Sequence, residues 1–322
     1  MRRFPSTEAE NPLVHFVILN WNQTDLTLAC LQSVFNQDYP ALRVIVVDNG
    51  STDGSASIIK SAYPQATVLE TGTNVGYSLG NNIGIQCAMQ DKADYVFLLN
   101  NDTELDRYML SELVAVAESD PEIGVTGPTM LYYGAPETIW CAGNSIDWHS
   151  GATHRLRADN DVRTLVNESN EQVDFITSCA VCIKRMVFEE IGLMDKRFFI
   201  YYDEADWFVR AATAGWRTVY VPSAKMWHKV SATMGESSPS TDYYMVRNSF
   251  LFLAKNLHGT RRVRSIAIRA FDVMRMIAAY TLKNRNAVRL RNRDAKLLAI
   301  RDALLGRWGQ MGKDVAVILA VS

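Results

Sequence analysis

Short apolar runs alternate with segments of helical periodicity over the first third of the chain. The apolar runs predict strands at residues 14–19, 42–47, 68–69 and 95–99. The periodic segments predict helices that begin near residue 24 and that cover 52–63, 77–89 and 105–118. Short connections join these elements. This alternation is typical of an α/β fold with a mostly parallel sheet and helices on both of its faces.

The alternation breaks down near residue 124, where short strands and loops are expected up to residue 148. Further on, the pattern predicts strands at 173–183 and 218–221 and helices at 186–191 and 207–214. From residue 243 the chain becomes helical, with one apolar face expected in the later part. That face comprises Ile266, Ala270, Val273, Met274, Ile277 and Tyr280.

Polar residues follow three of the predicted strands, at positions 20–22, 48–51 and 100–102. In sheets of this kind, ligands bind beyond the carboxyl ends of the strands, so we expect these clusters to form one site. The first strand is not followed by GxGxxG, and GxxxxGK[ST] does not occur in the sequence. We therefore expect a divalent metal, rather than a glycine-rich loop, to hold the phosphates of a ligand.

Asp102 and Asp48 are the candidate ligand-binding carboxylates at these strand ends. The Asp102 carboxylate suits Mg²⁺ or Mn²⁺, although Asp102 or Thr103 could instead cap the helix expected from residue 105. Asp48 could accept a hydrogen bond from the imide of a pyrimidine base, or it could only form a turn.

An acidic segment and a late histidine supply the other candidates. Asp203, Glu204 and Asp206 could simply favour the positive end of a helix. In their partly aromatic setting they also suggest a general base. His228 is a candidate metal ligand only if the fold brings it back to Asp102.

Four ordered segments carry a resemblance to a known family: 17–22, 46–55, 74–82 and 98–103. Together with Phe198 to Trp207 and Trp227-His228, they resemble family 2 glycosyltransferases of the GT-A fold, in particular the bacterial rhamnosyltransferase-like branch. The resemblance covers roughly residues 13–256. It implies a single, inverting transfer of a sugar, rhamnose being one candidate, from a dTDP or UDP donor to a glycan or a lipid-linked glycan in cell-surface polysaccharide synthesis.

The resemblance also implies roles for individual residues. Glu204 is expected to be the catalytic base, with Asp203 as the second choice, and Asp102 and His228 are the expected ligands of Mg²⁺ or Mn²⁺. Residues 100 and 101 are asparagines where the family has its acidic metal motif. The expected donor-binding residues are Asn20, Asn22, Asp48, Asn74, Gly76, Asn81, Asn101 and Arg247. The expected acceptor-binding residues are Tyr202, Asp206 and Trp207.

Composition and charge add a division of the chain. The 322 residues are 48% hydrophobic and 21% charged, as in ordinary globular proteins. From Lys255 onward there are 15 Lys and Arg against 4 Asp and Glu, whereas the whole chain carries a net charge of −2. We expect an N-terminal tail at 1–12, a catalytic domain at 13–256 with halves 13–123 and 124–256, and a basic helical region at 257–322.

The basic region has two interpretations. It could pack against the catalytic domain or a second copy of the chain, or it could lie on an anionic membrane. It lacks the interleaved aromatic residues typical of nucleic-acid binding. Because no signal-like or membrane-spanning segment is recognised, we expect a cytoplasmic protein, or one on the cytosolic face of the inner membrane.

Two other functions remain open from the sequence. A sugar-nucleotide nucleotidyltransferase also uses a metal at a strand end. Such an enzyme is expected to have a Gly-, Arg- or Lys-rich loop after the first strand, where this chain has Asn20-Trp21-Asn22. A non-catalytic nucleotide- or glycan-binding module with a decayed metal site is the second alternative, because Asn100 and Asn101 are neutral.

Overall fold

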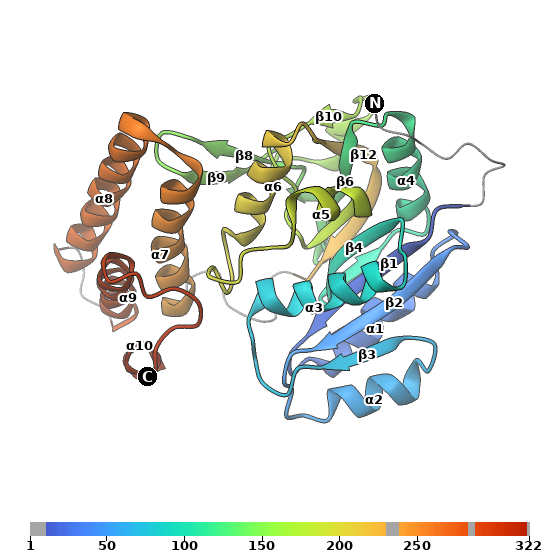
Figure 1. Cartoon of the computed structure of the whole chain (residues 1–322), viewed down its shortest axis with the longest axis horizontal. Helices are drawn as coiled ribbons and strands as arrows, with labels where there is room; N and C mark the ends of the chain where they lie inside the picture. The colour runs from blue at the N-terminus through green and yellow to red at the C-terminus, as the bar shows by residue number, and fades with distance from the viewer. Residues whose placement is uncertain (1–10, 230–237, 283–286, 321–322) are drawn as a thin grey trace.

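The computed structural model describes residues 11–229, 238–282 and 287–320 (Figure 1). The strands of the main sheet are β1 (Val14–Asn20), β2 (Leu42–Asp48), β3 (Thr67–Glu70), β4 (Tyr95–Asn100), β5 (Thr103–Leu105), β6 (Ile123–Tyr132), β7 (Ala135–Cys141), β10 (Glu171–Gln172), β11 (Ala180–Lys184) and β12 (Arg217–His228). Their order is β10-β12-β6-β11-β4-β1-β2-β3, with β5 on β12 and β7 on β6. Strands β8 (Asn144–Asp147) and β9 (Ala152–Arg155) form a separate hairpin.

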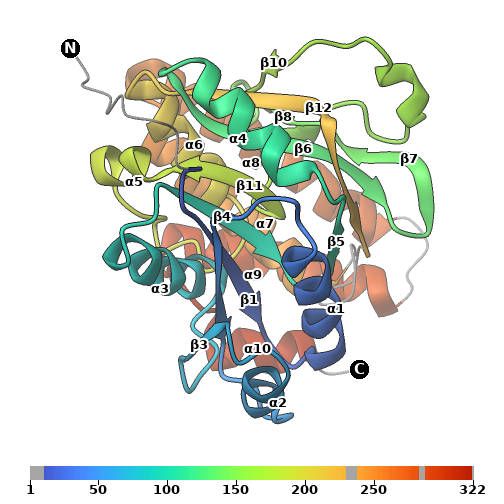
Figure 2. The same cartoon turned by 90° about the vertical axis from the view of Figure 1, so that its right-hand side faces the viewer.

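Helices cover both faces of the main sheet (Figure 2). They are α1 (Thr24–Phe35), α2 (Ser55–Ala62), α3 (Tyr77–Gln90), α4 (Met109–Ser119), α5 (Arg185–Ile191) and α6 (Asp203–Thr213), with a 3₁₀ turn at Val162–Leu165. Strand β1 shows how the two faces are divided. Leu19 packs against Gly80 of α3, whereas the next side chain, Asn20, points to Thr27 of α1. Because successive side chains of a strand point to opposite faces, α1 and α3 lie on opposite sides of the sheet.

The sheet is mixed, and its first half is entirely parallel. Strands β4, β1, β2 and β3 run parallel to one another, as do β6 and β12, while β11 joins the two groups in antiparallel fashion. Strands β1, β2 and β4 are buried on both faces, which explains why they are near-continuous apolar runs in the sequence, whereas the edge strand β3 is partly exposed. The expected α/β fold with a mostly parallel sheet is therefore confirmed.

Two predicted elements differ from the structure. The helix expected over 105–118 begins only at Met109, because residues 103–105 form strand β5 and pair with β12. The strand expected over 173–183 is limited to Ala180–Lys184. In the part before it, Val173 donates its backbone N–H to the carbonyl of Thr218, and Ser178 turns toward α6. In both places long-range contacts outweigh the local apolar pattern.

Four further helices form the end of the molecule away from β3: α7 (Pro239–Asn256), α8 (Gly259–Leu282), α9 (Ala287–Leu304) and α10 (Lys313–Ala320) (Figure 1). Helix α7 joins this end to the sheet domain. Leu251, Phe252 and Leu253 belong to the main core, whereas Tyr243 and Tyr244 belong to a second core shared with α8, α9 and α10. None of the helices in the described part of the chain has the length and apolar composition needed to cross a bilayer.

Candidate functional site

A chain of hydrogen bonds links the ends of β1, β2 and β4. Asn101 donates its side-chain amide to the Thr27 hydroxyl (2.9 Å), and that hydroxyl donates to Asn20 Oδ1 (2.8 Å). Asn20 Nδ2 in turn donates to Asp48 Oδ2 (2.8 Å), while the Ser51 backbone N–H donates to Asp48 Oδ1 (2.9 Å). The structure therefore brings three of the predicted strand-end residues together, and Thr27 is the link that the sequence did not reveal.

The loop before α3 lies beside this network. Asn74 Oδ1 accepts the backbone N–H of Gly76 (2.9 Å), and Asn49 Oδ1 accepts that of Val75 (2.9 Å). Asn22, on the neighbouring loop, is exposed and accepts the Thr52 N–H through Oδ1 (2.7 Å). Asn49 was not among the predicted site residues, although it is buried and holds the loop that Asn74 and Gly76 form.

Asp102 and His228 meet although 125 residues separate them in the chain. The pairing of β5 with β12 places His228 opposite Thr103, and His228 Nε2 lies 3.2 Å from Asp102 Oδ1. The cap of helix α4 is Tyr108, so neither Asp102 nor Thr103 serves as the helix cap that the sequence left open. The condition set for His228 as a candidate metal ligand, its return to Asp102, is met.

The polar atoms of this pair fit a cation. Asp102 Oδ1 is buried and forms no hydrogen bond with any of residues 11–229, 238–282 and 287–320, although His228 Nε2 lies 3.2 Å from it. Buried polar atoms are nearly always paired, so an unpaired carboxylate oxygen beside an imidazole needs an explanation. A divalent ion bound through oxygen and nitrogen ligands supplies one. No group of three or more Asp, Glu, His or Cys in the described residues could hold a metal, so other ligands would have to complete such a site.

The two carboxylates at the start of α6 have different surroundings. Glu204 is partly exposed, and its Oε2 accepts hydrogen bonds from the Ser178 hydroxyl (2.6 Å), the Ser178 N–H (2.7 Å) and the Thr177 hydroxyl (3.2 Å). Asp203 is buried, and its Oδ2 accepts only the Ser78 hydroxyl of α3 (3.0 Å) among the side-chain bonds of the described chain. Of the two, Glu204 is therefore the one with access to a substrate.

The protonation of this pair is shifted toward neutral pH. Burial, and then the negative charge of Glu204, raise the pKa of Asp203 to about 7. Burial also raises the pKa of Glu204 above its usual value, against the lowering effect of its bonds with Ser178 and Thr177. Asn100 donates its backbone N–H to the Cys179 carbonyl (2.9 Å), and Ser178, the residue before Cys179, binds Glu204. The start of α6 therefore lies beside the end of β4.

The segment that precedes α6 is held in an unusual backbone conformation. Phe199, Tyr201 and Tyr202 have positive φ angles of 65°, 64° and 64°. Asn248 of α7 donates its amide to the carbonyls of Phe198 (2.8 Å), Ile200 (2.7 Å) and Tyr201 (3.1 Å). Positive φ in bulky residues persists only where neighbours impose it, and it is enriched at functional sites. Asn248 is therefore a positioning residue for the acidic segment.

Tyr202, Asp206 and Trp207, the residues expected to bind the acceptor, all have buried side chains in this structure. The Tyr202 hydroxyl donates to the Gly151 carbonyl (3.0 Å), and Trp207 Nε1 donates to the Gly192 carbonyl (2.9 Å). Asp206 forms an ion pair with Lys255 (2.8 Å) and also accepts the Asn256 amide. In this structure these contacts anchor α6, and the expected role of the three residues in acceptor binding stays a prediction.

Two expected donor-binding residues are also buried and occupied elsewhere. Arg247 has no exposed surface, stacks on Tyr243 and Tyr244, and donates to the Gly309 carbonyl (2.7 Å). In this structure the guanidinium ties α7 to the C-terminal segment, and its expected contact with the diphosphate stays a prediction. Asn81 is buried within α3, where its amide donates to the Tyr77 carbonyl (3.0 Å), and its expected contact with the donor stays a prediction too.

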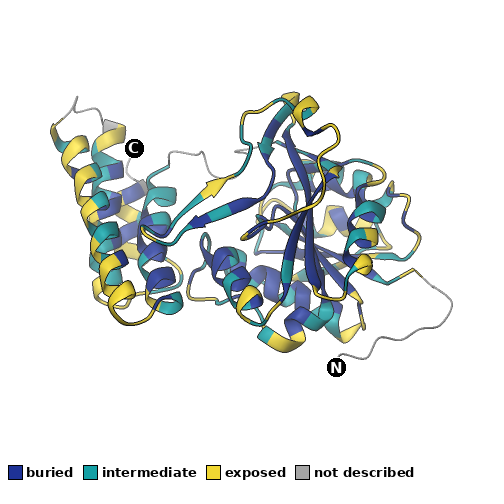
Figure 3. Cartoon of the chain, turned by 90° about the horizontal axis from the view of Figure 1, so that it is seen from above, coloured by how far each residue is buried: buried dark blue, intermediate teal, exposed yellow. Residues whose placement is uncertain are grey.

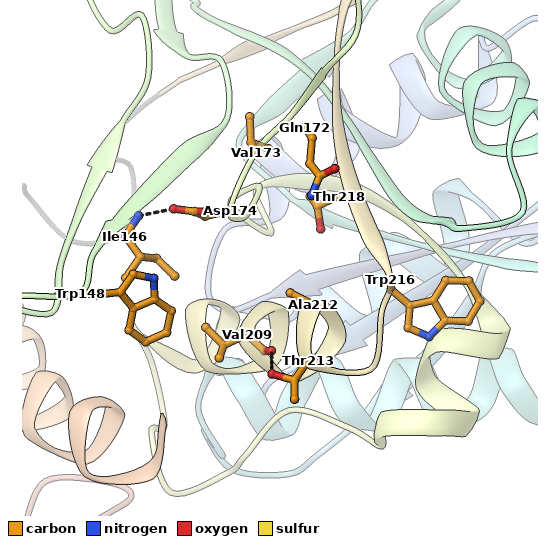
Figure 4. Close-up of a pocket in the computed structure, with 10 residues that line it drawn as sticks. All are labelled: Ile146, Trp148, Gln172, Val173, Asp174, Val209, Ala212, Thr213, Trp216 and Thr218. Atoms are coloured by element: carbon orange, nitrogen blue, oxygen red, sulfur yellow. Dashed lines mark hydrogen bonds between the residues drawn. The ribbon is translucent and has the colours of Figure 1, made fainter. Parts of the chain in front are cut away.

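A separate hollow of about 310 Å³ lies along the distal half of α6 (Figure 4). Its lining residues are Ile146, Trp148, Gln172, Val173, Asp174, Val209, Ala212, Thr213, Trp216 and Thr218. Asp174 is held there by the Ile146 backbone N–H (2.7 Å). Because the lining residues of α6 are 209–213, whereas Glu204 lies at the other end of that helix, the hollow is not part of the strand-end site.

Replacing Gly76 with Ala should destabilise the fold by about 1–3 kcal/mol. Gly76 has a φ of +90°, and an added Cβ would lie 2.4 Å from the Phe199 ring. Gly134→Ala is a matched control, since no atom lies within 4 Å of the Cβ that it would add. Urea unfolding monitored by circular dichroism checks this. Equal midpoints for the two variants would contradict the tight contact between this loop and the acidic segment.

Replacing Asp203 with Asn should make stability less dependent on pH. An unfolded aspartate has a pKa of about 3.9, whereas that of folded Asp203 is about 7. Between these values the folded chain holds one proton more, so the stability from this group is complete at low pH and is lost as pH rises through about 7. Relative to wild type, the variant should therefore gain stability with rising pH. The free energies of unfolding of wild type and variant are measured by urea titration below and above neutral pH. A difference between the two proteins that stays the same at both pH values would refute the raised pKa.

Residues 16–192 match glycosyl transferase family 2. This match covers more than half of the chain, so the protein belongs to glycosyl transferase family 2 and is a transferase.

Individual relatives support the same branch of the family. The N-acetylglucosaminyl-diphospho-decaprenol L-rhamnosyltransferase of Mycobacterium tuberculosis is 26% identical over 234 residues, which are 67% of this chain and 76% of that protein. The dTDP-rhamnosyl transferase RfbF of Shigella flexneri is 24% identical over 229 residues, covering 66% of this chain and 71% of that protein. The resemblance to the rhamnosyltransferase-like branch is thereby confirmed.

Solved structures of similar fold contain a nucleotide or nucleotide sugar and Mn²⁺. GalNAc-T7 with UDP, GalNAc and Mn²⁺ has a TM-score of 0.61 at 18% identity; the match covers 88% of this chain but only 54% of GalNAc-T7. The mannosyltransferase PcManGT of Pyrobaculum calidifontis, with GDP-Man and Mn²⁺, has a TM-score of 0.58 at 16% identity, with coverage of 92% and 88%. At these identities the likeness establishes the fold, and the expected GT-A fold is confirmed.

Proposed function

We propose that this chain transfers one sugar, with inversion, from a dTDP- or UDP-sugar to a glycan or lipid-linked glycan in cell-surface polysaccharide synthesis. The observation that carries the proposal is the arrangement beside the end of β4, where Asp102 meets His228 and the partly exposed Glu204 binds Ser178, the residue before Cys179. The names of the relatives from Mycobacterium tuberculosis and Shigella flexneri favour rhamnose as the sugar and dTDP as the carrier.

In the proposed reaction, Glu204 is the general base. As the acceptor hydroxyl attacks the anomeric carbon, its proton passes to the Glu204 carboxylate, and the bond from that carbon to the diphosphate breaks on the opposite side. The bonds from Ser178 and Thr177 orient Glu204 through Oε2 and leave Oε1 for the substrate. Asp203 is the second choice for the base, because its side chain is buried and accepts a hydrogen bond from the Ser78 hydroxyl of α3.

A divalent cation, Mg²⁺ or Mn²⁺, would be held by Asp102 Oδ1 and His228 Nε2, which face each other at 3.2 Å. Such an ion usually takes one or two protein ligands and completes its shell with substrate phosphates and water. When bound, it would supply positive charge that stabilises the leaving diphosphate. The neighbouring Asn101 is uncharged, and its side-chain amide donates a hydrogen bond to the Thr27 hydroxyl.

The donor nucleotide is proposed to lie along the ends of β1 and β2. Asp48 would accept the imide N–H of the pyrimidine base, and Asn20 orients its carboxylate from behind. Asn22 is exposed on the adjoining loop, and the loop of Asn74 and Gly76 forms the next wall. The hydrogen bonds that hold this set together support a preformed pocket.

A panel of nucleotide sugars tests the proposal. With Mn²⁺ present, dTDP- and UDP-sugars should raise the melting temperature more than GDP-sugars, because Asp48 pairs with an imide that guanine presents differently. Slow release of nucleotide from the preferred donor should also be detected. Binding without release would favour a non-catalytic module, whereas pyrophosphate formation from a sugar phosphate and a nucleoside triphosphate would favour a nucleotidyltransferase.

We further propose that residues 13–256 form the catalytic domain, preceded by a tail at 1–12, and that residues 257–322 form an accessory region. Helix α7 links the two parts, since its first half packs in the second core and its last turns pack in the main core. Peripheral contact with the cytosolic face of the inner membrane, or with a second copy, is proposed for the accessory region. Flotation with lipid vesicles detects the membrane contact, and light scattering detects a dimer.

A further inference from the structure

Helix α8 carries an exposed apolar stripe over nearly its whole length. The residues of this stripe, which we call the outer stripe, are Val263, Ala267, Phe271, Met274, Ala278 and Leu282. Phe271 is 65% exposed, Met274 52% and Leu282 81%. Their spacing of three or four residues places them on one side of the helix. The outer stripe therefore extends for roughly 30 Å at 1.5 Å per residue.

The outer stripe is distinct from the face by which α8 packs on the protein. Ser265, Val273 and Ile277 are the buried residues of α8, and Val273 and Ile277 belong to the second core. At 100° per residue these positions lie to the side of the stripe and away from its centre. Met274 was predicted to share one apolar face with Val273 and Ile277, but Met274 is exposed whereas those two residues are buried. Figure 3 shows the exposed colour recurring along the outermost helices.

Arginines follow one edge of the outer stripe. Arg261, Arg264 and Arg275 are exposed, and α8 contains five arginines against one acid, Asp272. The acid lies beyond the arginines, 3.8 Å from Arg275. An apolar stripe bordered by cations is the pattern of a helix that lies in a membrane interface.

We propose that the outer stripe and its arginine edge dock this enzyme on an anionic lipid surface. The apolar side chains would enter the boundary between headgroups and acyl chains, and the arginines would contact lipid phosphates. A second copy of the chain fits less well, because it would present the same excess of cations to this face. The inference rests on the proposed function only in that a lipid-linked acceptor would give the docking a purpose.

Flotation of the full chain with vesicles tests the docking. Wild type should float with phosphatidylcholine vesicles that contain phosphatidylglycerol and should remain at the bottom with phosphatidylcholine alone. The double variant Phe271→Ser/Met274→Ser should bind at least about tenfold more weakly, since two apolar side chains no longer enter the lipid. Arg264→Gln/Arg275→Gln should weaken binding too and should make it less sensitive to salt.

Val166→Ser/Ile58→Ser is the matched control, because these apolar residues are also exposed but lie far from α8 in the sheet domain. It should float like wild type. Equal flotation of the control and the Phe271/Met274 variant would overturn the inference, as would absence of wild-type flotation. A dimer seen by light scattering that the Phe271/Met274 variant abolishes would assign the stripe to a second copy instead. Transfer to a water-soluble acceptor should be unchanged in this variant, so failure of the docking and failure of the proposed reaction are distinguishable.

Discussion

Replacing Glu204 with Gln should lower the rate of sugar transfer by about 10²–10⁴-fold, the usual contribution of a general base. Glutamine keeps the size of the side chain and can still accept the bonds from Ser178 and Thr177, but it cannot take the acceptor proton. Donor affinity should remain close to that of wild type. Initial rates with saturating donor and acceptor, together with calorimetric titration of the nucleotide, measure the two effects separately.

Two comparisons make this result specific. Glu189→Gln removes an exposed carboxylate whose ion pair with Arg185 lies within α5, and it should leave transfer unchanged. Asp203→Asn should reduce transfer less than Glu204→Gln, because Asp203 is buried behind Ser78. If Asp203→Asn lost more activity than Glu204→Gln, the base would be Asp203. The wild-type rate should also rise with pH as the raised pKa of Glu204 is passed, since a base acts only when deprotonated.

Replacing Asp102 with Asn should weaken the binding of Mn²⁺ in the presence of nucleotide by at least about tenfold. Residues 100 and 101 are asparagines, so Asp102 is the only carboxylate at this strand end that can hold the ion. His228→Gln should have a smaller effect, because it removes an uncharged ligand and leaves the carboxylate of Asp102. Titration calorimetry with MnCl₂ reports this directly and does not depend on activity.

The control for charge is Glu104→Gln, two residues along the chain on strand β5. Glu104 pairs with Trp227 in the register of β5 and β12, so its side chain is one position removed from that of His228. It should keep wild-type affinity for Mn²⁺. Unchanged affinity in Asp102→Asn, with a melting curve like that of wild type, would contradict the proposed site.

Local patterns identified most of the first half of the fold. Strands β1, β2 and β4 are buried on both faces, and they therefore appear as continuous apolar runs that end at polar residues. Those ends included Asn20, Asp48 and Asp102, which the structure places in or beside one site. Short strands such as β5 were missed, because three residues carry too little pattern to outweigh a neighbouring helix signal.

Three residues of the segments that resemble the family are bonded within the fold in a way that the sequence did not reveal. Asp206, Trp207 and Arg247 stand beside functional positions in the sequence, yet each is fully buried and bonded to another part of the chain. Ser178 carried no signal of its own, because serine is common in loops, and Asn248 stood out only through its neighbour Arg247, as part of an element expected near the diphosphate. Their importance follows only from which atoms they reach, namely Glu204 and the carbonyls of the preceding segment.

The sequence by itself determined the class of fold, the strand ends that carry polar residues, and the family to which those motifs belong. These follow from short-range periodicity and from residue types in order along the chain. Only the tertiary structure decided that His228 meets Asp102, that Glu204 rather than Asp203 reaches the surface, and that α8 has a second, uncovered apolar face. Each of these depends on pairing or burial between segments far apart in the chain, and a local pattern contains no information about such contacts.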